Sequence, residues 1–225
     1  MTFAVRIASD PAREMAIAFA SFALDHTGPL YLAVSGGTTP RDFFRHLVGS
    51  YRDALPWSRM HLFQVDERCV PPEDAQSNWR MINEEIVSQV TFGSVRPMEA
   101  ESDSAVDEYI GILNREAPSN ERGVPRFDLV LLGMGADGHT ASLFPGSTAL
   151  EERTRPVTKV YVESLDSWRV TLTLPVLQAA ARRWFLLRGE DKAPAFAEVR
   201  QGHLPAGNLL PASVWFMDPA AAGET

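Results

Sequence analysis

The chain has 225 residues, of which 45% are hydrophobic and 22% are charged, so it carries enough apolar material for a sizeable core and disorder is not expected. Its formal net charge is -8, which argues against a nucleic-acid partner because such proteins usually present a basic face. A small anionic ligand stays open, since a few local cations suffice to bind one phosphate.

The apolar pattern alternates between short strands and amphipathic helices. In chain order we expect a helix over 11–26, a strand over 30–34, a helix over 39–47, a strand over 60–65, helices over 77–87 and 104–115, a strand over 127–132, β-like segments over 157–162 and 170–174, a short helix over 175–181, a strand over 184–187, a helix over 191–199 and a last strand over 213–217. Strands that alternate with helices imply crossover connections and a mainly parallel sheet. We therefore predict an α/β protein in which residues 1–225 form a single domain.

The segments that follow the expected strands carry most of the chemically active side chains. Ligands of open parallel sheets bind at the carboxyl ends of the strands. The segments with the most polar, charged and glycine residues lie there, at 35–38, 66–68, 133–140 and 189–192. The agreement between the rule and the composition predicts one site at that edge of the sheet.

The first of these segments reads Ser35-Gly36-Gly37-Thr38 and joins a strand to a helix. Two glycines let backbone N–H groups approach an anion, the helix N-terminus adds a favourable dipole, and the two hydroxyl groups are further donors. It is neither a Walker loop nor a G-x-G-x-x-G turn. A tight turn with a helix cap explains the same pattern equally well.

The segment Gly133–Thr140 follows the most apolar strand and contains three glycines. Glycine at Gly135 allows a ligand to approach the backbone closely. Asp137 and His139 stand two residues apart, and histidine is the usual general acid–base, which a carboxylate can orient. A lone histidine more often bonds its own loop, but its place at the end of a strand favours a functional role.

Charged and amide side chains stand near the remaining strand ends. Asp66 and Arg68 follow a buried strand and, taken alone, read as a solvated strand end. Asn78 opens a helix, where capping or turn chemistry is the local interpretation. Lys192 lies in a first helical turn, where the dipole disfavours a cation unless an anionic ligand offsets it. Arg169, just before a β-like segment, is a further candidate cation.

Other chemistries and compartments fit less well. There is no G-x-S-x-G elbow for a serine hydrolase and no H-x-x-x-H pair for zinc. The single cysteine, Cys69, excludes an intramolecular disulfide and suits a reducing compartment. The N-terminal residues show no signal-peptide pattern, and no run reaches the roughly 18 apolar residues of a membrane helix. We expect a cytoplasmic protein without a membrane partner.

Five segments together resemble one family. They are SGGTTP, VDERCVPPEDAQSNWRM, FDLVLLGMGADGHTASLFPG, RVTLTLPVLQAAARRWFLLRGEDKA and LPASVWFMD, and they span roughly residues 30 to 220. In content and order they are similar to the signatures of 6-phosphogluconolactonases. Thr38, where serine is common, and Ala136, where proline is common, are small departures.

The resemblance implies a fold, a reaction and a site. The fold is a three-layer α/β/α, Rossmann-like fold with a mainly parallel sheet, shared with glucosamine-6-phosphate deaminases and ribose-5-phosphate isomerases. The reaction is hydrolysis of 6-phosphoglucono-δ-lactone to 6-phosphogluconate, with no metal and no organic cofactor. The resemblance makes His139, Asp137, Arg68 and Asp66 the candidate catalytic group, and it makes Ser35, Gly36, Gly37, Thr38, Asn78, Gly135, Arg169 and Lys192 the candidates for binding substrate and phosphate. We expect a sugar-phosphate substrate, and a monomer or a weak homo-oligomer.

Two alternatives remain at this point. One is a glucosamine-6-phosphate deaminase-like isomerase, since that family shares the Asp-Gly-His turn; its motif usually has a glutamate five residues after the histidine, where this chain has Phe144. The other is a sugar-phosphate sensor that kept the fold and lost the chemistry. The intact set of Asp66, Arg68, His139 and Lys192 speaks against the sensor.

Overall fold

The computed structural model describes residues 3–224 of the chain. Its strands are β1 (Ala4–Ile7), β2 (Leu30–Val34), β3 (Met60–Gln64), β4 (Asp66–Arg68), β5 (Ser94–Arg96), β6 (Leu129–Leu132), β7 (Val157–Val162), β8 (Ser167–Leu172), β9 (Arg183–Leu187) and β10 (Ser213–Met217). Its α-helices are α1 (Pro11–Asp25), α2 (Thr38–Tyr51), α3 (Asn78–Ile82), α4 (Ala105–Glu116), α5 (Leu174–Ala179), α6 (Ala193–Arg200), α7 (Leu204–Gly207) and α8 (Pro219–Ala222).

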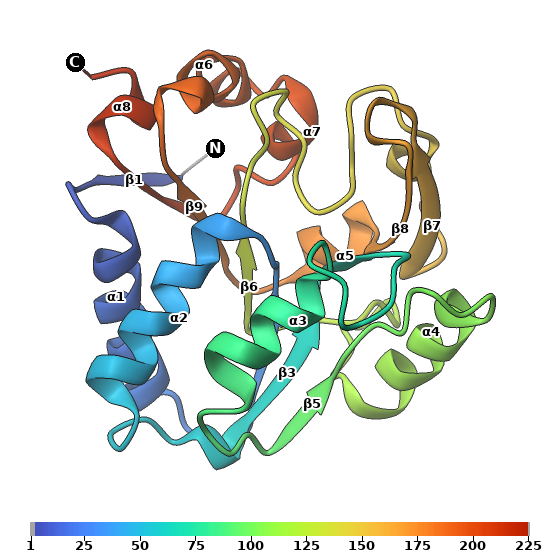
Figure 1. The fold of residues 1–225 in the computed structure, drawn as a ribbon, viewed down its shortest axis with the longest axis horizontal. Helices are drawn as coiled ribbons and strands as arrows, with labels where there is room; N and C mark the ends of the chain where they lie inside the picture. The colour runs from blue at the N-terminus through green and yellow to red at the C-terminus, as the bar shows by residue number, and fades with distance from the viewer. Residues whose placement is uncertain (1–2, 225) are drawn as a thin grey trace.

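A seven-stranded parallel sheet forms the centre of the molecule, in the order β1-β10-β9-β6-β2-β3-β5 (Figure 1). Alternate strand residues point to opposite faces, so the sheet contributes side chains to two hydrophobic clusters, one on each face. Leu32, Leu131 and Leu186 pack on one face with α1, α2 and α3. Their neighbours Ala33 and Leu132 pack on the other face, with α4 to α8. The predicted three-layer α/β/α fold with a mainly parallel sheet is therefore confirmed.

A second sheet of three antiparallel strands, in the order β4-β8-β7, lies beside the carboxyl ends of the main sheet. Figure 1 shows β7 and β8 at the upper right, next to the yellow loop that follows β6. The expected β-like segment at 157–162 is strand β7. The one expected at 170–174 is strand β8, which begins earlier, at Ser167, and ends at Leu172, so Arg169 lies within the strand and not before it. The interpretation of 66–68 as a solvated strand end is wrong, because these residues form β4 and pair with β8.

Other boundaries also differ from the sequence-based expectation. The edge strands β1 and β5 were not predicted: every residue of β1 is exposed, so it lacks an alternating pattern. The expected helix over 77–87 continues beyond Ile82 as a π-helix over Asn83–Val87. The expected helix over 191–199 begins as a 3-10 turn, Glu190–Lys192, so Lys192 is the N-cap of α6. No helix within residues 3–224 is long and apolar enough to cross a bilayer.

Candidate active site

A cleft opens where the carboxyl ends of β2, β6 and β9 meet the small sheet. The candidate residues that line it are Ser35, Gly36, Gly37, Thr38, Asp66, Arg68, Asn78, Gly135, His139, Arg169 and Lys192. The remaining candidate, Asp137, lies behind His139 and lines a neighbouring cavity. The residues that the sequence singled out thus come together in one place, although they are spread over more than half of the chain.

The glycine loop brings the N-terminus of α2 to the cleft. Gly37 is the N-cap residue and has φ 104°, a conformation that favours glycine. The first N–H groups of a helix have no acceptor within the helix, and the first turn of α2 contains no acidic residue. These N–H groups, with the hydroxyls of Ser35 and Thr38, give the cleft a wall suited to an anion.

His139 is held by Asp137 from one side. The carboxylate oxygen Oδ1 lies 2.6 Å from the ring Nδ1 and 3.1 Å from the backbone nitrogen of His139. Burial raises the pKa of Asp137, but the hydrogen bonds and the charge interaction with His139 outweigh it, and the net pKa lies below the usual value. An ionised acceptor at Nδ1 favours the tautomer with the proton on Nδ1, which leaves Nε2 able to accept a proton.

The loop that carries His139 is tightly constrained. A Cβ on Gly135 would lie 2.2 Å from the imidazole ring, so only glycine fits there. Gly138 has φ 79° and lies against Leu204, and Ala141 has a φ of 52°, which is uncommon for a residue with a Cβ. Backbone strain of this kind concentrates at functional sites.

Phe144 covers the imidazole and also faces a guanidinium group. Its ring lies 4.0 Å from the His139 ring, centroid to centroid, with the planes 23° apart. The guanidinium carbon of Arg169 lies 5.7 Å from the same ring. Sequence reasoning used Phe144 only to separate two families and missed this contact, because nothing in the local pattern shows which ring lies against the histidine.

Two arginines stand directly opposite each other on β4 and β8, where like charges destabilise a sheet. Arg169 is 8% exposed, and burial, followed by repulsion from Arg68, lowers its pKa. The Nε atoms of both are buried without a hydrogen-bond partner in the described part of the chain. An anionic ligand would supply the missing acceptor and would add to the negative charge of Asp66 and Glu67, which already favours the charged form of Arg169.

Asp66 and Asn78 are joined in a buried network at the floor of the cleft. The Asn78 amide donates to the backbone oxygen of Asp66 at 3.0 Å, and the Ser142 hydroxyl donates to the Asp66 carboxylate at 2.7 Å. The interpretation of Asn78 as a helix cap is wrong, because Ser77 caps α3. Asn78 Oδ1 is buried without a partner among residues 3–224, as is the hydroxyl of Ser35, so both can accept or share a hydrogen bond from a ligand.

Lys192 contributes the third cation of the cleft. It lies at the start of α6, and its Nζ is 2.8 Å from the carboxylate of Asp191. Its side chain is 20% exposed whereas that of Asp191 is 60% exposed, so the lysine faces the cleft and its partner faces solvent. This position places a positive charge in the same cleft as the glycine loop.

Glu67, between Asp66 and Arg68, is a buried residue that the sequence did not indicate. It is 2% exposed, and burial raises the pKa of its carboxyl group although several hydrogen bonds act in the opposite direction. A run of three charged residues carries no signal that the middle one is buried, because the groups around its carboxylate come from Gln64 and from the start of α3. Across residues 3–224, no group of three or more His, Cys, Asp or Glu side chains is arranged to hold a metal ion.

Open α/β sheets that hold cations and an acid–base histidine at the carboxyl ends of their strands are typical of enzymes that bind small anionic ligands. The chain belongs to the family described as glucosamine-6-phosphate isomerases/6-phosphogluconolactonase, which matches residues 7–220.

Individual relatives agree with this assignment. The chain is 35% identical over 173 residues to a 6-phosphogluconolactonase of Treponema pallidum, which covers 76% of this chain and 72% of the relative. It is 32% identical over 243 residues to the probable 6-phosphogluconolactonase 2 of Arabidopsis thaliana, covering 94% and 92% of the two chains. The crystal structure of 6-phosphogluconolactonase from Leishmania guyanensis is similar with a TM-score of 0.89 and 26% identity, over 99% of this chain and 98% of that one.

Proposed function

We propose that this protein is a 6-phosphogluconolactonase, which hydrolyses 6-phospho-D-glucono-1,5-lactone to 6-phospho-D-gluconate in the oxidative pentose phosphate pathway. The observation that carries the proposal is the imidazole of His139, held at Nδ1 by Asp137 and open to a cleft that contains three cations and a glycine loop. The names of the relatives support the same reaction.

The geometry suits attack by water on an ester carbonyl. Nε2 of His139 takes a proton from water as the water oxygen bonds to C1 of the lactone, and the carbonyl oxygen becomes an oxyanion. Arg68 is placed to stabilise this charge or to hold the hydroxyl groups of the lactone. When the bond between C1 and the ring oxygen breaks, the imidazolium returns its proton to that oxygen, which yields a carboxylic acid that ionises in solution.

The phosphate group would lie between the glycine loop and the cations. Helix N–H groups of α2 and the hydroxyls of Ser35 and Thr38 are donors for its oxygens, and Lys192 and Arg169 offset its charge. Asp66 and Asn78, fixed in their network, are placed to bind hydroxyl groups of the sugar acid. The presence of each of these residues in the lining of the cleft supports the assignments.

Phe144 supports lactone hydrolysis over the deaminase-like alternative. A carboxylate at this position would be available for ring opening and isomerisation, whereas the apolar ring of Phe144 stacks on His139 and has no proton to transfer. The lactonase names of relatives at 32% to 35% identity agree. We further propose that residues 1–225 form a single cytoplasmic domain that works as a monomer or a weak homo-oligomer.

The decisive experiment uses fresh lactone generated in place by glucose-6-phosphate dehydrogenase. Formation of 6-phosphogluconate is compared with the spontaneous rate, with wild type, His139→Ala and no protein, each with and without a chelator. We expect acceleration that resists chelation and that falls at least 10²-fold in His139→Ala, the lower end of acid–base catalysis. No acceleration by folded wild type would exclude the function, and near-normal turnover by folded His139→Ala would exclude the base.

A further inference from the structure

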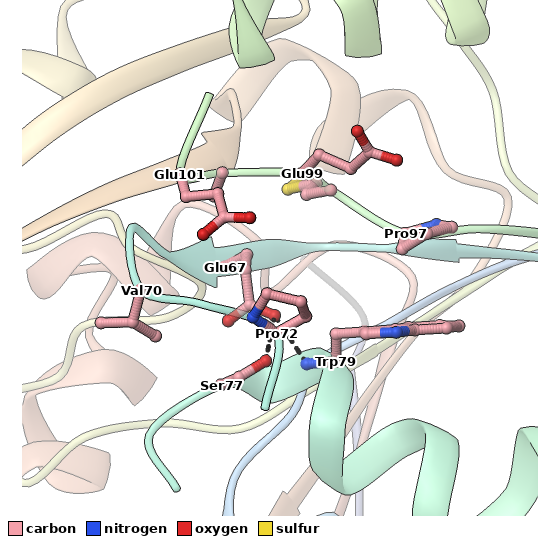
Figure 2. Close-up of a pocket in the computed structure, with 10 residues that line it drawn as sticks. Glu67, Val70, Pro72, Ser77, Trp79, Pro97, Glu99 and Glu101 are labelled. Carbon is pink, nitrogen blue, oxygen red and sulfur yellow. Dashed lines mark hydrogen bonds between the residues drawn. The ribbon is translucent and has the colours of Figure 1, made fainter. Parts of the chain in front are cut away.

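The carboxylate of Glu67 lies at the junction between β4 and the first turn of α3. Side chains alternate along a strand, so Asp66 and Arg68 face the catalytic cleft while Glu67 points to the other side. Figure 2 shows it directed toward Ser77 and Trp79, beside a second pocket. Glu67 thus lines that second pocket and does not line the catalytic cleft.

Its two carboxylate oxygens accept five hydrogen bonds. Oε1 accepts from the backbone nitrogens of Arg68 at 2.8 Å and Asn78 at 2.7 Å. Oε2 accepts from the backbone nitrogen of Trp79 at 2.6 Å, from Gln64 Nε2 at 3.0 Å and from the hydroxyl of Ser77 at 3.1 Å. Three of the five donors are backbone groups, so Glu67 holds the backbone of β4 and of the start of α3 in place, and not only side chains.

The two segments that Glu67 connects, β4 and the start of α3, carry three residues that line the cleft: Asp66, Arg68 and Asn78. Asn78 sits at the start of α3, its amide donates to Asp66, and its Oδ1 is so close to Gly36 that a Cβ there would lie 2.4 Å away. A shift of α3 relative to β4 would therefore move Asn78, Asp66 and the glycine loop together. Because a misplacement of about 1 Å in an active site can cost on the order of 10²-fold in rate, this junction matters for turnover.

We propose that Glu67 is a positioning residue of the active site, which holds Asn78, Asp66 and Arg68 in register with the substrate without touching it. The proposal rests on the proposed lactonase function for its kinetic consequence. A carboxylate is required because every partner donates: glutamine has nearly the same shape, but its NH₂ group would face N–H donors and leave at least one of them unpaired.

The test compares Glu67→Gln and Glu67→Asp with wild type and with Glu84→Gln as the matched control. Glu84 is exposed, and within residues 3–224 its carboxylate pairs only with Arg80. Melting temperature, kcat and KM for the lactone, and the Kd for 6-phosphogluconate are measured well below the melting temperature of each variant. Crystal structures of wild type and Glu67→Gln locate Asn78 and Arg68.

We expect Glu67→Gln to lose about 10- to 100-fold in kcat/KM with Asn78 displaced, Glu67→Asp to fall between it and wild type because its shorter side chain keeps the charge, and Glu84→Gln to match wild type. If Glu67→Gln does not fold, Glu67→Asp decides. Wild-type kcat/KM in a folded Glu67 variant, or Asn78 unmoved in its crystal structure, would overturn the proposal. A wild type without turnover would instead refute the proposed function, and the position of Asn78 and the Kd for 6-phosphogluconate would still decide the role of Glu67.

Discussion

The imidazole of His139 lies flat against the ring of Phe144, with centroids 4.0 Å apart and planes inclined by 23°. With Asp137 bonded to Nδ1, the ring is held both in its plane and on its face. Phe144 itself is only 8% exposed, so the contact belongs to the packed interior and not to a mobile surface loop. This arrangement orients Nε2 before substrate arrives.

Replacing Phe144 separates stacking from packing. Phe144→Ala should lose about 3–5 kcal/mol of stability as a core truncation, and also activity, because the imidazole is no longer held. Phe144→Leu keeps most of the volume, so it should recover most of the stability while kcat stays about 3- to 10-fold low, as expected for an aromatic contact worth about 0.5–1.5 kcal/mol. Urea unfolding and steady-state kinetics measure the two effects. Wild-type kcat in Phe144→Leu would show that stacking has no catalytic role.

Asp137→Asn tests the carboxylate that orients His139. The amide can offer its NH₂ group to Nδ1 and stabilise the wrong tautomer, so we expect kcat to fall by about 10²-fold with little change in KM. The comparison needs a folded variant, which circular dichroism establishes. An unchanged kcat would mean that the loop backbone alone sets the tautomer.

The lowered pKa of Asp137 also predicts how stability depends on pH. The folded protein binds this proton less tightly than the unfolded chain does, whose value is about 3.8. The stabilisation by the carboxylate is therefore fully present above pH 3.8 and is lost as the pH falls through the lower pKa of the folded state. Denaturant unfolding of wild type and Asp137→Asn from about pH 5 downward should show two curves that converge in acid. A constant difference in unfolding free energy between the two proteins at every pH would contradict the lowered pKa of Asp137.

The site could be located from the sequence because ligands of parallel sheets bind at the carboxyl ends of the strands, and the pattern along the chain shows where each strand ends. Ser35, His139 and Lys192 each follow a strand of the main sheet, so their meeting could be expected without knowing any contact. The resemblance added Asn78, whose local pattern pointed to a cap, and supported Arg169, which its position near a strand had already made a candidate cation.

The rest depended on contacts between distant parts of the chain. Arg68 and Arg169 become neighbours only because β4 and β8 pair antiparallel, and neither the short strand β4 nor this pairing has a signal in the local pattern. Glu67, which otherwise reads as a solvated charge, is buried against Gln64 and the first residues of α3, a contact that the local pattern does not show. Phe144 entered the sequence analysis only as the residue that replaces a glutamate of the deaminase motif, and its place over the histidine is visible only in the folded chain.

Lys192→Ala and Thr38→Ala test the phosphate wall of the cleft. If phosphate contacts are the same in the ground state and the transition state, both variants should raise KM more than they lower kcat. A hydrogen bond to a charged group is worth about 1.5–3 kcal/mol, so Lys192→Ala should raise KM by roughly 10- to 100-fold. Lys159→Ala is the control, since Lys159 lies over Trp168 outside this cleft. Equal losses of kcat in both variants would argue that these groups act in the chemical step.

Gly36→Ala should lower catalytic activity, whereas the matched control Gly49→Ala should not. A Cβ at Gly36 would lie 2.4 Å from Oδ1 and 2.5 Å from Cβ of Asn78, so the loop or the asparagine must move. Asn78 cannot yield easily, because its amide is bonded to Asp66 and its backbone to Glu67. We expect kcat/KM to fall by about 10²-fold.

The control is Gly49 in α2, where an added Cβ would meet open space. Gly49→Ala should therefore keep full activity and gain about 0.5–1 kcal/mol of stability. Normal kinetics in a folded Gly36→Ala would mean that the glycine loop tolerates displacement and does not set the position of the substrate.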